Sequence, residues 1–184
     1  MDEGLISKRY AKALYFHASD MGEETLLYHR MQILDALLRK MPEFKASLKS
    51  PMILVKDKMN LLENVTGKNP EQSYLDFINL VITNRREDTL HLIVLSYQKF
   101  YRQKKNINIV HLISAKKISG KAIERIRYLT EQQTHGKVEF STHIDPSIDG
   151  GFIFQLNDIR IDASVKGQLN QISRRLAQIN KSII

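Results

Sequence analysis

The chain has 184 residues, of which 28 are Lys or Arg and 20 are Asp or Glu, so its formal net charge is +8. It has no Cys, which excludes a disulfide framework, a thiolate zinc site, an iron–sulfur cluster and a cysteine nucleophile. No stretch without a charged residue exceeds ten residues, the length of Asn106 to Ala115. A membrane-spanning helix needs about 20 apolar residues, so no transmembrane segment is expected.

Apolar residues at helical spacing predict three helices in the first fifty residues. They are a helix over about Gly4–Ser19, a second over about Glu23–Lys40, and a short third that begins at Pro42 and ends at Ser50-Pro51. Proline suits the first turn of a helix, and the residue before a proline disfavours the helical region. The second helix has the clearest apolar stripe, formed by Leu27, Met31, Leu34 and Leu38.

Three more helices are predicted before residue 106. One covers about Val55–Thr66 and ends at Gly67, which suits a left-handed C-terminal position. The next begins at Asn69-Pro70-Glu71-Gln72, with Asn69 as the N-cap. The last covers about Arg86–Lys105. The helix after Asn69 is apolar on nearly every side from Tyr74 to Ile82, so we expect it to be central and to leave one face for a partner.

The hydrophobic period changes near residue 106. The pattern predicts a strand over Ile107–Ile113, a helix capped by Ser119 that stops at Gly136, and an alternating strand over Val138–Ile144. Asn157-Asp158 predicts a hairpin turn between strands at Gly151–Leu156 and Ile159–Ala163. The adjacent Gly150 and Gly151 predict positive φ or a close backbone approach. A closing helix is predicted from Val165, Leu169, Ile172, Leu176 and Ile179.

These elements together predict an α+β protein of two domains. Residues 1–105 form an N-terminal six-helix bundle, and residues 106–184 form a small α/β C-terminal domain. We expect the boundary to lie where helical spacing gives way to β-branched runs, beside Lys104-Lys105.

Residues that would carry catalysis are missing from the pattern. The six His do not form pairs at metal-binding spacing. Ser119-Gly120-Lys121 lacks the earlier Gly and the following Ser or Thr of a phosphate-binding loop. The aspartates between Asp145 and Asp162 lack the spacing and the final Glu of a calcium loop. We therefore predict no catalytic residue, no cofactor and no metal site, and a role in binding instead.

Five segments, in order along the chain, resemble one known family. They are Ile6–Leu14, Phe77–Ile82 followed by Asn84-Arg85-Arg86, Ser114-Ala115, Ile144–Phe152, and Asp162–Val165 followed by Gln168-Leu169. The first of them, with Tyr10-Ala11 and Ala13-Leu14, is similar to the opening of the delta subunit of rotary F-type ATP synthase. The mitochondrial counterpart of that family is the oligomycin-sensitivity-conferring protein. The resemblance extends over essentially the whole chain.

The resemblance implies a non-catalytic stator subunit that links the catalytic head to the peripheral stalk, so that rotation is coupled to ATP synthesis. It implies that the N-terminal domain binds the N-terminal helix of an alpha subunit in a groove between its first and fifth helices. The groove positions in this sequence would be Ile6, Tyr10, Ala13, Leu14, Tyr74, Phe77, Ile78 and Val81. It also implies that the C-terminal domain meets subunit b of the stalk, with one copy of this subunit per complex and a monomer when free.

The alternative is a basic nucleic-acid-binding adaptor protein. It is favoured by the charge of +8 and by the 7 Phe and 7 Tyr, but most of these aromatics lie on predicted core stripes and no recognition module is evident. The resemblance implies no nucleic acid and a membrane contact only through the complex. Acidic residues follow Met1 where a signal peptide would carry bases. We therefore expect a peripheral location on the cytoplasmic face of the bacterial plasma membrane.

Overall fold

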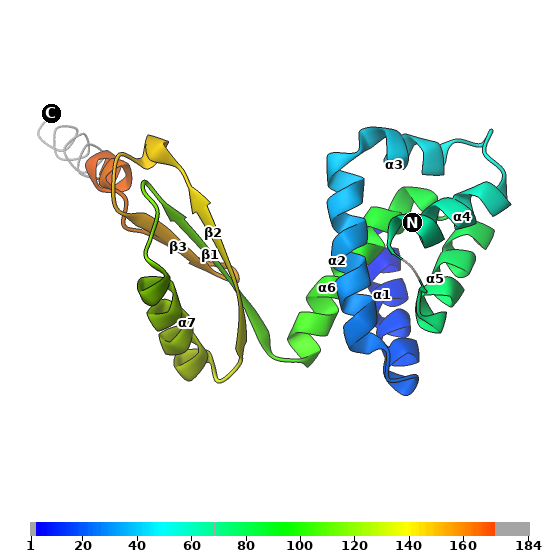
Figure 1. The fold of residues 1–184 in the computed structure, drawn as a ribbon, viewed down its shortest axis with the longest axis horizontal. Coiled ribbons are helices and arrows are strands. Elements are labelled where there is room, and N and C mark those ends of the chain that lie inside the picture. The colour runs from blue at the N-terminus through cyan, green and yellow to red at the C-terminus, as the bar shows by residue number, and fades with distance from the viewer. Residues whose placement is uncertain (1–2, 68, 172–184) are drawn as a thin grey trace, which may run out of the picture. The chain divides into compact units, whose positions relative to one another are not determined.

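The computed structural model describes residues 3–67 and 69–171, and the chain divides into two compact units, Met1–Lys105 and Asn106–Ile184. The described residues contain helices and one four-stranded sheet, so the α+β class is confirmed (Figure 1). The helices α1 to α6 belong to the first unit, and the strands belong to the second.

The first unit is built from helices whose apolar stripes meet in its centre. Their bounds are α1 Glu3–Asp20, α2 Glu24–Lys40, α3 Pro42–Lys49, α4 Val55–Val65, α5 Gln72–Thr83 and α6 Leu90–Lys104, with a short 3-10 turn η1 at Glu87–Thr89. The predicted stripe of α2 is confirmed, because Leu27, Met31 and Leu34 have no exposed surface. Helices α1, α2 and α6 pack together, and the rings of Tyr28 on α2 and Tyr101 on α6 stack at 4.2 Å.

The start of α5 differs from the prediction. Asn69 is not an N-cap: it has a positive φ of 51°, and α5 begins three residues later, after Glu71. The cause is Arg30 of α2, whose guanidinium donates to the Thr66 carbonyl, the Asn69 carbonyl and the Glu71 carboxylate. These long-range bonds hold Thr66, Asn69 and Glu71 outside a regular helix.

The start of α6 also differs by a few residues. The chain forms the η1 turn after Arg86, and regular helix begins at Leu90. A 3-10 turn is a common way to begin an α-helix. Here it is held by Lys58 of α4, whose Nζ lies 2.7 Å from Oε1 of Glu87, with both side chains largely buried.

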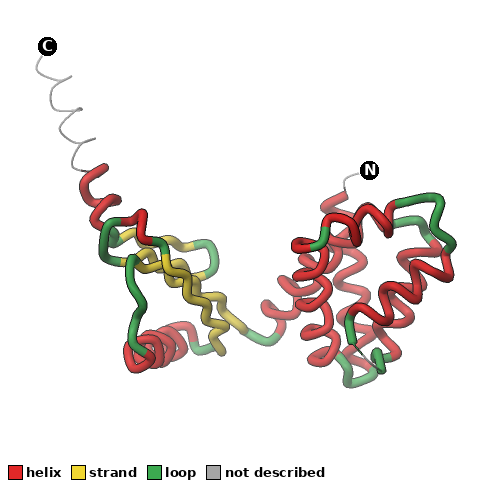
Figure 2. Tube along the Cα trace, turned by 45° about the horizontal axis from the view of Figure 1, so that its top comes forward, coloured by secondary structure: helices red, strands yellow, loops and turns green. Residues whose placement is uncertain are grey.

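The second unit has a four-stranded sheet with the order β2-β1-β3-β4. Its elements are β1 Ile107–Ser114, α7 Gly120–Thr134, β2 Lys137–Ile144, η2 Pro146–Ile148, β3 Phe152–Leu156 and β4 Ile159–Asp162. Strands β1 and β2 are parallel and are joined by α7, whereas β1–β3 and β3–β4 are antiparallel. Figure 2 shows the strands of this sheet in yellow. The predicted hairpin is confirmed, with Asn157 at a φ of 51° in its turn.

The register divides the sheet into two faces. Val110 pairs with Phe140 and with Leu156, which pairs with Ile159, so these four share one face. Helix α7 covers part of this face, because Arg127 lies over the ring of Phe140 at 5.9 Å and Val110 is fully buried. Ser119 caps α7 as predicted, its side chain accepting from the Ala122 N–H.

Helix α7 ends directly before Gly136, as predicted. His135, not Gly136, takes the left-handed conformation, and its carbonyl accepts from the Asn106 side chain at 2.8 Å. Gly136 is required for a different reason, because a Cβ there would lie 2.4 Å from the Asn106 carbonyl oxygen. The closing helix is present at residues 165–171, whereas Ile172, Leu176 and Ile179 lie outside the described residues.

Candidate functional site

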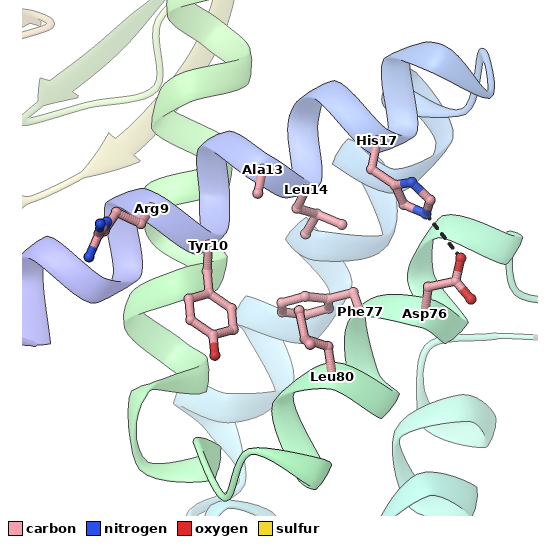
Figure 3. A pocket seen from close by; sticks show the side chains of 8 residues that line it. All are labelled: Arg9, Tyr10, Ala13, Leu14, His17, Asp76, Phe77 and Leu80. Atoms are coloured by element: carbon pink, nitrogen blue, oxygen red, sulfur yellow. Dashed lines mark hydrogen bonds and ion pairs between the residues drawn. The ribbon is translucent and has the colours of Figure 1, made fainter.

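An apolar groove runs between α1 and α5 in the first unit. It has a volume of about 510 Å³ and is lined by Arg9, Tyr10, Ala13, Leu14 and His17 from α1 and by Asp76, Phe77 and Leu80 from α5. Leu14 and Phe77 are buried and form its floor, whereas Leu80 is 51% exposed. Figure 3 shows the Tyr10, Leu14, Phe77 and Leu80 side chains directed into the space between the two helices.

Polar contacts join the two helices at both ends of the groove. At one end the Asn84 side chain donates to Oη of Tyr10 at 3.4 Å. At the other end Nε2 of His17 lies 2.9 Å from Oδ2 of Asp76, while the Gln72 side chain donates to Oδ1 at 2.8 Å. The His17 bond, followed by the Gln72 bond, lowers the pKa of the Asp76 carboxyl below its ordinary value. These polar contacts thus hold α1 and α5 together at the two ends of the groove and leave its apolar floor uncovered.

Four of the eight predicted positions line the groove, namely Tyr10, Ala13, Leu14 and Phe77. The other four, Ile6, Tyr74, Ile78 and Val81, are buried and lie outside the lining, and the last three have no exposed surface. Tyr74 donates its hydroxyl to the Leu62 carbonyl at 2.9 Å, and burial raises its pKa to about 12. Of the expected set, these four side chains therefore pack in the core of the unit and do not line the groove.

The sequence reasoning missed four lining residues, Arg9, His17, Asp76 and Leu80. Leu80 lies three residues after Phe77, so helical spacing alone could have placed it on the groove face. Asp76 is the one charged residue between Gln72 and Thr83, and this isolated charge in an apolar helix was a second usable signal.

The groove has the chemistry of a binding surface. Its centre is apolar, and its charged groups lie on side chains near its ends. The described residues contain no group of three or more His, Asp or Glu side chains that could hold a metal ion. None of the helices in the described ranges is long and apolar enough to cross a membrane. A cleft of this kind between two helices suits the apolar face of a third helix.

Comparison with known proteins finds relatives along the whole length of the chain. The family model described as ATP synthase delta (OSCP) subunit matches residues 6–176. ATP synthase subunit delta of Bacteroides fragilis is 38% identical over 186 residues, covering 100% of both chains. The same subunit of Phocaeicola vulgatus is 35% identical, covering 98% of both. These relatives give no support to a nucleic-acid-binding adaptor.

A solved structure has the same fold. A chain of the Toxoplasma gondii mitochondrial ATP synthase hexamer superimposes with a TM-score of 0.71 and 18% identity, covering 96% of this chain and 98% of that one. The family model and the full-length relatives carry the assignment, because they span the groove and both units of the chain. The chain therefore belongs to the ATP synthase delta (OSCP) subunit family.

Proposed function

We propose that this chain joins the catalytic head of ATP synthase to its peripheral stalk and does no bond chemistry itself. The helical unit, acting as a six-helix bundle, binds the N-terminal helix of an alpha subunit, and the α/β unit binds subunit b. A stator subunit must resist torque, so it needs slow dissociation from both neighbours. Apolar anchors at helical spacing provide this, and affinity depends on the quality of the anchors more than on the area buried.

The observation that carries the proposal is the groove between α1 and α5. Its floor of Leu14 and Phe77 is flanked by Tyr10 and by Leu80, which exposes half of its surface. A leucine with this exposure beside a concave apolar floor gains burial when a helix docks. The proposed contacts are therefore Tyr10, Ala13, Leu14, Phe77 and Leu80, with the buried α5 residues acting as support.

Leu80→Asp tests the groove directly. Because Leu80 is exposed, the variant is expected to fold, yet it places a charge in an apolar anchor site. We expect binding of a labelled peptide of about 25 residues from the N-terminus of the same organism's alpha subunit to weaken by more than about 2 kcal/mol. Fluorescence anisotropy with the full chain measures the affinity.

Leu26→Asp is the matched control, because Leu26 is 57% exposed on α2 and does not line the groove. It should bind the peptide as the wild type does. Circular dichroism must show that both variants are folded. Equal affinity of the Leu80 and Leu26 variants would overturn the groove assignment.

The second unit offers an apolar surface for the stalk. Phe154 pairs with Ile161, so these residues share the sheet face that includes Leu156 and Ile159. Ile159 and Ile161 on the edge strand β4 remain mostly exposed. We place the contact with subunit b on this part of the face.

Ile161→Ser should therefore weaken the pull-down of a soluble fragment of subunit b. Arg160→Ser, on the opposite face of the sheet, should not weaken it. Equal effects of the two changes would reject this placement.

The chain is associated with the membrane through the complex. The two sequence relatives named above, from Bacteroides fragilis and Phocaeicola vulgatus, come from bacteria, which supports a position on the cytoplasmic face of the plasma membrane. Fractionation of cells provides the check: the chain should sediment with membranes and be released together with the catalytic head when the head is stripped off.

A further inference from the structure

We propose that the groove between α1 and α5 is electrostatically polarised and selects a partner helix that has an acidic residue at one end of its apolar stripe and a basic residue about two turns away. This inference rests on the proposed function of the groove and specifies the partner that fits it. The juxtaposition that carries it is Arg9 at one end of the lining and Asp76 at the other.

Because α1 and α5 run in opposite directions, the charged side chains determine the electrostatic field in the groove. Tyr10 contacts Asn84, and His17 contacts Asp76, so α1 and α5 run antiparallel along the groove. The dipoles of antiparallel helices oppose each other and largely cancel at each end. The field within the groove is therefore set by its charged side chains.

The end at Asp76 is anionic. Asp76 is 43% exposed, and each of its carboxylate oxygens accepts one hydrogen bond, which leaves acceptor capacity for an incoming cation. The hydrogen bonds lower its pKa, so the carboxylate is charged at neutral pH. Glu23 adds a second carboxylate nearby, where it accepts from the Ser73 N–H one turn before Asp76.

The opposite end is cationic. Arg9 is exposed on the rim and has no carboxylate partner among the residues that the structure describes. Arg85 and Arg86 follow Asn84, the residue that contacts Tyr10 at this end. Arg9 and His17 are eight residues apart on α1, or about 12 Å at 1.5 Å per residue. A partner helix that matches both ends thus needs its acid and its base seven or eight residues apart.

The experiment compares charge-neutralised variants of the full chain. The probe is the labelled peptide from the N-terminus of the alpha subunit, and its binding affinity is measured at about 50 mM and about 500 mM salt. Arg9→Gln and Asp76→Asn should each weaken binding about two- to fivefold at low salt, the range of exposed ion pairs. The difference should shrink at high salt, because the Debye length falls to a few ångströms. Asparagine can still accept from His17, so the contact between the helices is retained.

Lys40→Gln and Asp158→Asn are the matched controls, since both residues are exposed and lie outside the groove. They should bind as the wild type does at both salt concentrations. Wild-type affinity of both groove variants at low salt would overturn the polarisation while leaving the groove itself intact. Absence of any binding by the wild type would instead overturn the proposed function of the groove.

Discussion

Arg30, in the middle of α2, donates from Nη2 to Oε1 of Glu71 at 3.0 Å, and Glu71 is the residue directly before α5. The same guanidinium donates from Nη1 to the Thr66 carbonyl at 3.0 Å. Both side chains of the pair are about nine-tenths buried. One cation thus determines where α4 ends and where α5 begins, and α5 forms one wall of the groove.

Arg30→Met should lower the free energy of unfolding by about 3–5 kcal/mol, because it leaves the Glu71 carboxylate buried and uncompensated. Urea unfolding followed by circular dichroism gives the value. Arg39→Met is the control on the same helix: Arg39 is 60% exposed in its pair with Asp35, so its loss should cost less than about 1 kcal/mol. Similar losses for the two variants would show that the Arg30 contacts are not structural.

The same pair predicts a dependence on pH. Burial raises the pKa of Glu71, but the side-chain hydrogen bond from Arg30, a backbone hydrogen bond at Glu71 and the charge of Arg30 together lower it by more. The pKa in the folded state therefore lies below the ordinary value of about 4.3. A carboxyl of this kind stabilises the fold fully above its unfolded pKa and loses that contribution as the pH falls through its folded pKa. The stability difference between wild type and Glu71→Gln should therefore be constant from pH 7 to about pH 5 and shrink below about pH 4.

Urea titrations at intervals from pH 7 to pH 3 measure that difference. Lys105 and Glu24 form an exposed pair that also lowers the pKa of its carboxyl, so Glu24→Gln serves to show how much of any trend comes from surface pairs. A difference for Glu71→Gln that stays constant down to pH 3 would contradict the assigned role of Arg30.

Local periodicity was enough to predict most helices and strands. The stripe of Leu27, Met31 and Leu34 on α2 and the turn at Asn157 depend on neighbours a few residues away, and both were predicted correctly. The start of α5 was not, because it is fixed by Arg30, which lies 41 residues from Glu71 in the sequence. Sequence spacing alone does not indicate a contact between residues so far apart in the chain.

The same contrast between features set by nearby residues and features set by distant residues applies to the groove. The first and fifth helices and four lining residues could be predicted, but the rotation of α5 about its axis could not. Leu80 and Val81 are adjacent and equally apolar, yet Leu80 is half exposed and Val81 has no exposed surface. Packing against the rest of the unit decides which of them faces out. The contact between His17 and Asp76, 59 residues apart, is likewise visible only in the folded chain.

The division at Lys105 predicts that the first unit folds alone. A fragment of residues 1–105 keeps the whole set α1 to α6 and the groove, so it should retain its helical dichroism and bind the alpha-subunit peptide with the affinity of the full chain. Its urea midpoint should match the helical transition of the intact protein. A fragment that is unfolded at neutral pH would reject the division into independent domains.

The last prediction concerns the glycine pair before β3. Gly150 and Gly151 have φ values of 145° and 73°, which confirms the expectation of positive φ, and a Cβ on Gly151 would lie 2.2 Å from the Ala163 carbonyl oxygen. Gly151→Ala should therefore destabilise the second unit by more than about 1 kcal/mol. Gly120→Ala is the control in the same unit, because a Cβ there meets nothing within 4 Å; it should be neutral or slightly stabilising.

The two units should respond differently to this change. The Gly151→Ala chain, and Gly150→Val with it, should still bind the alpha-subunit peptide, because the groove lies wholly in the first unit. In membranes, ATP hydrolysis should persist while ATP-driven proton pumping falls. The first unit of the variant should still be bound to the catalytic head, but the link between the head and the stalk should be weakened. Parallel assays of hydrolysis and of proton uptake separate these effects. Equal loss of peptide binding and of pumping would mean that the second unit is needed for the groove to fold, and would contradict the assignment of head and stalk contacts to separate units.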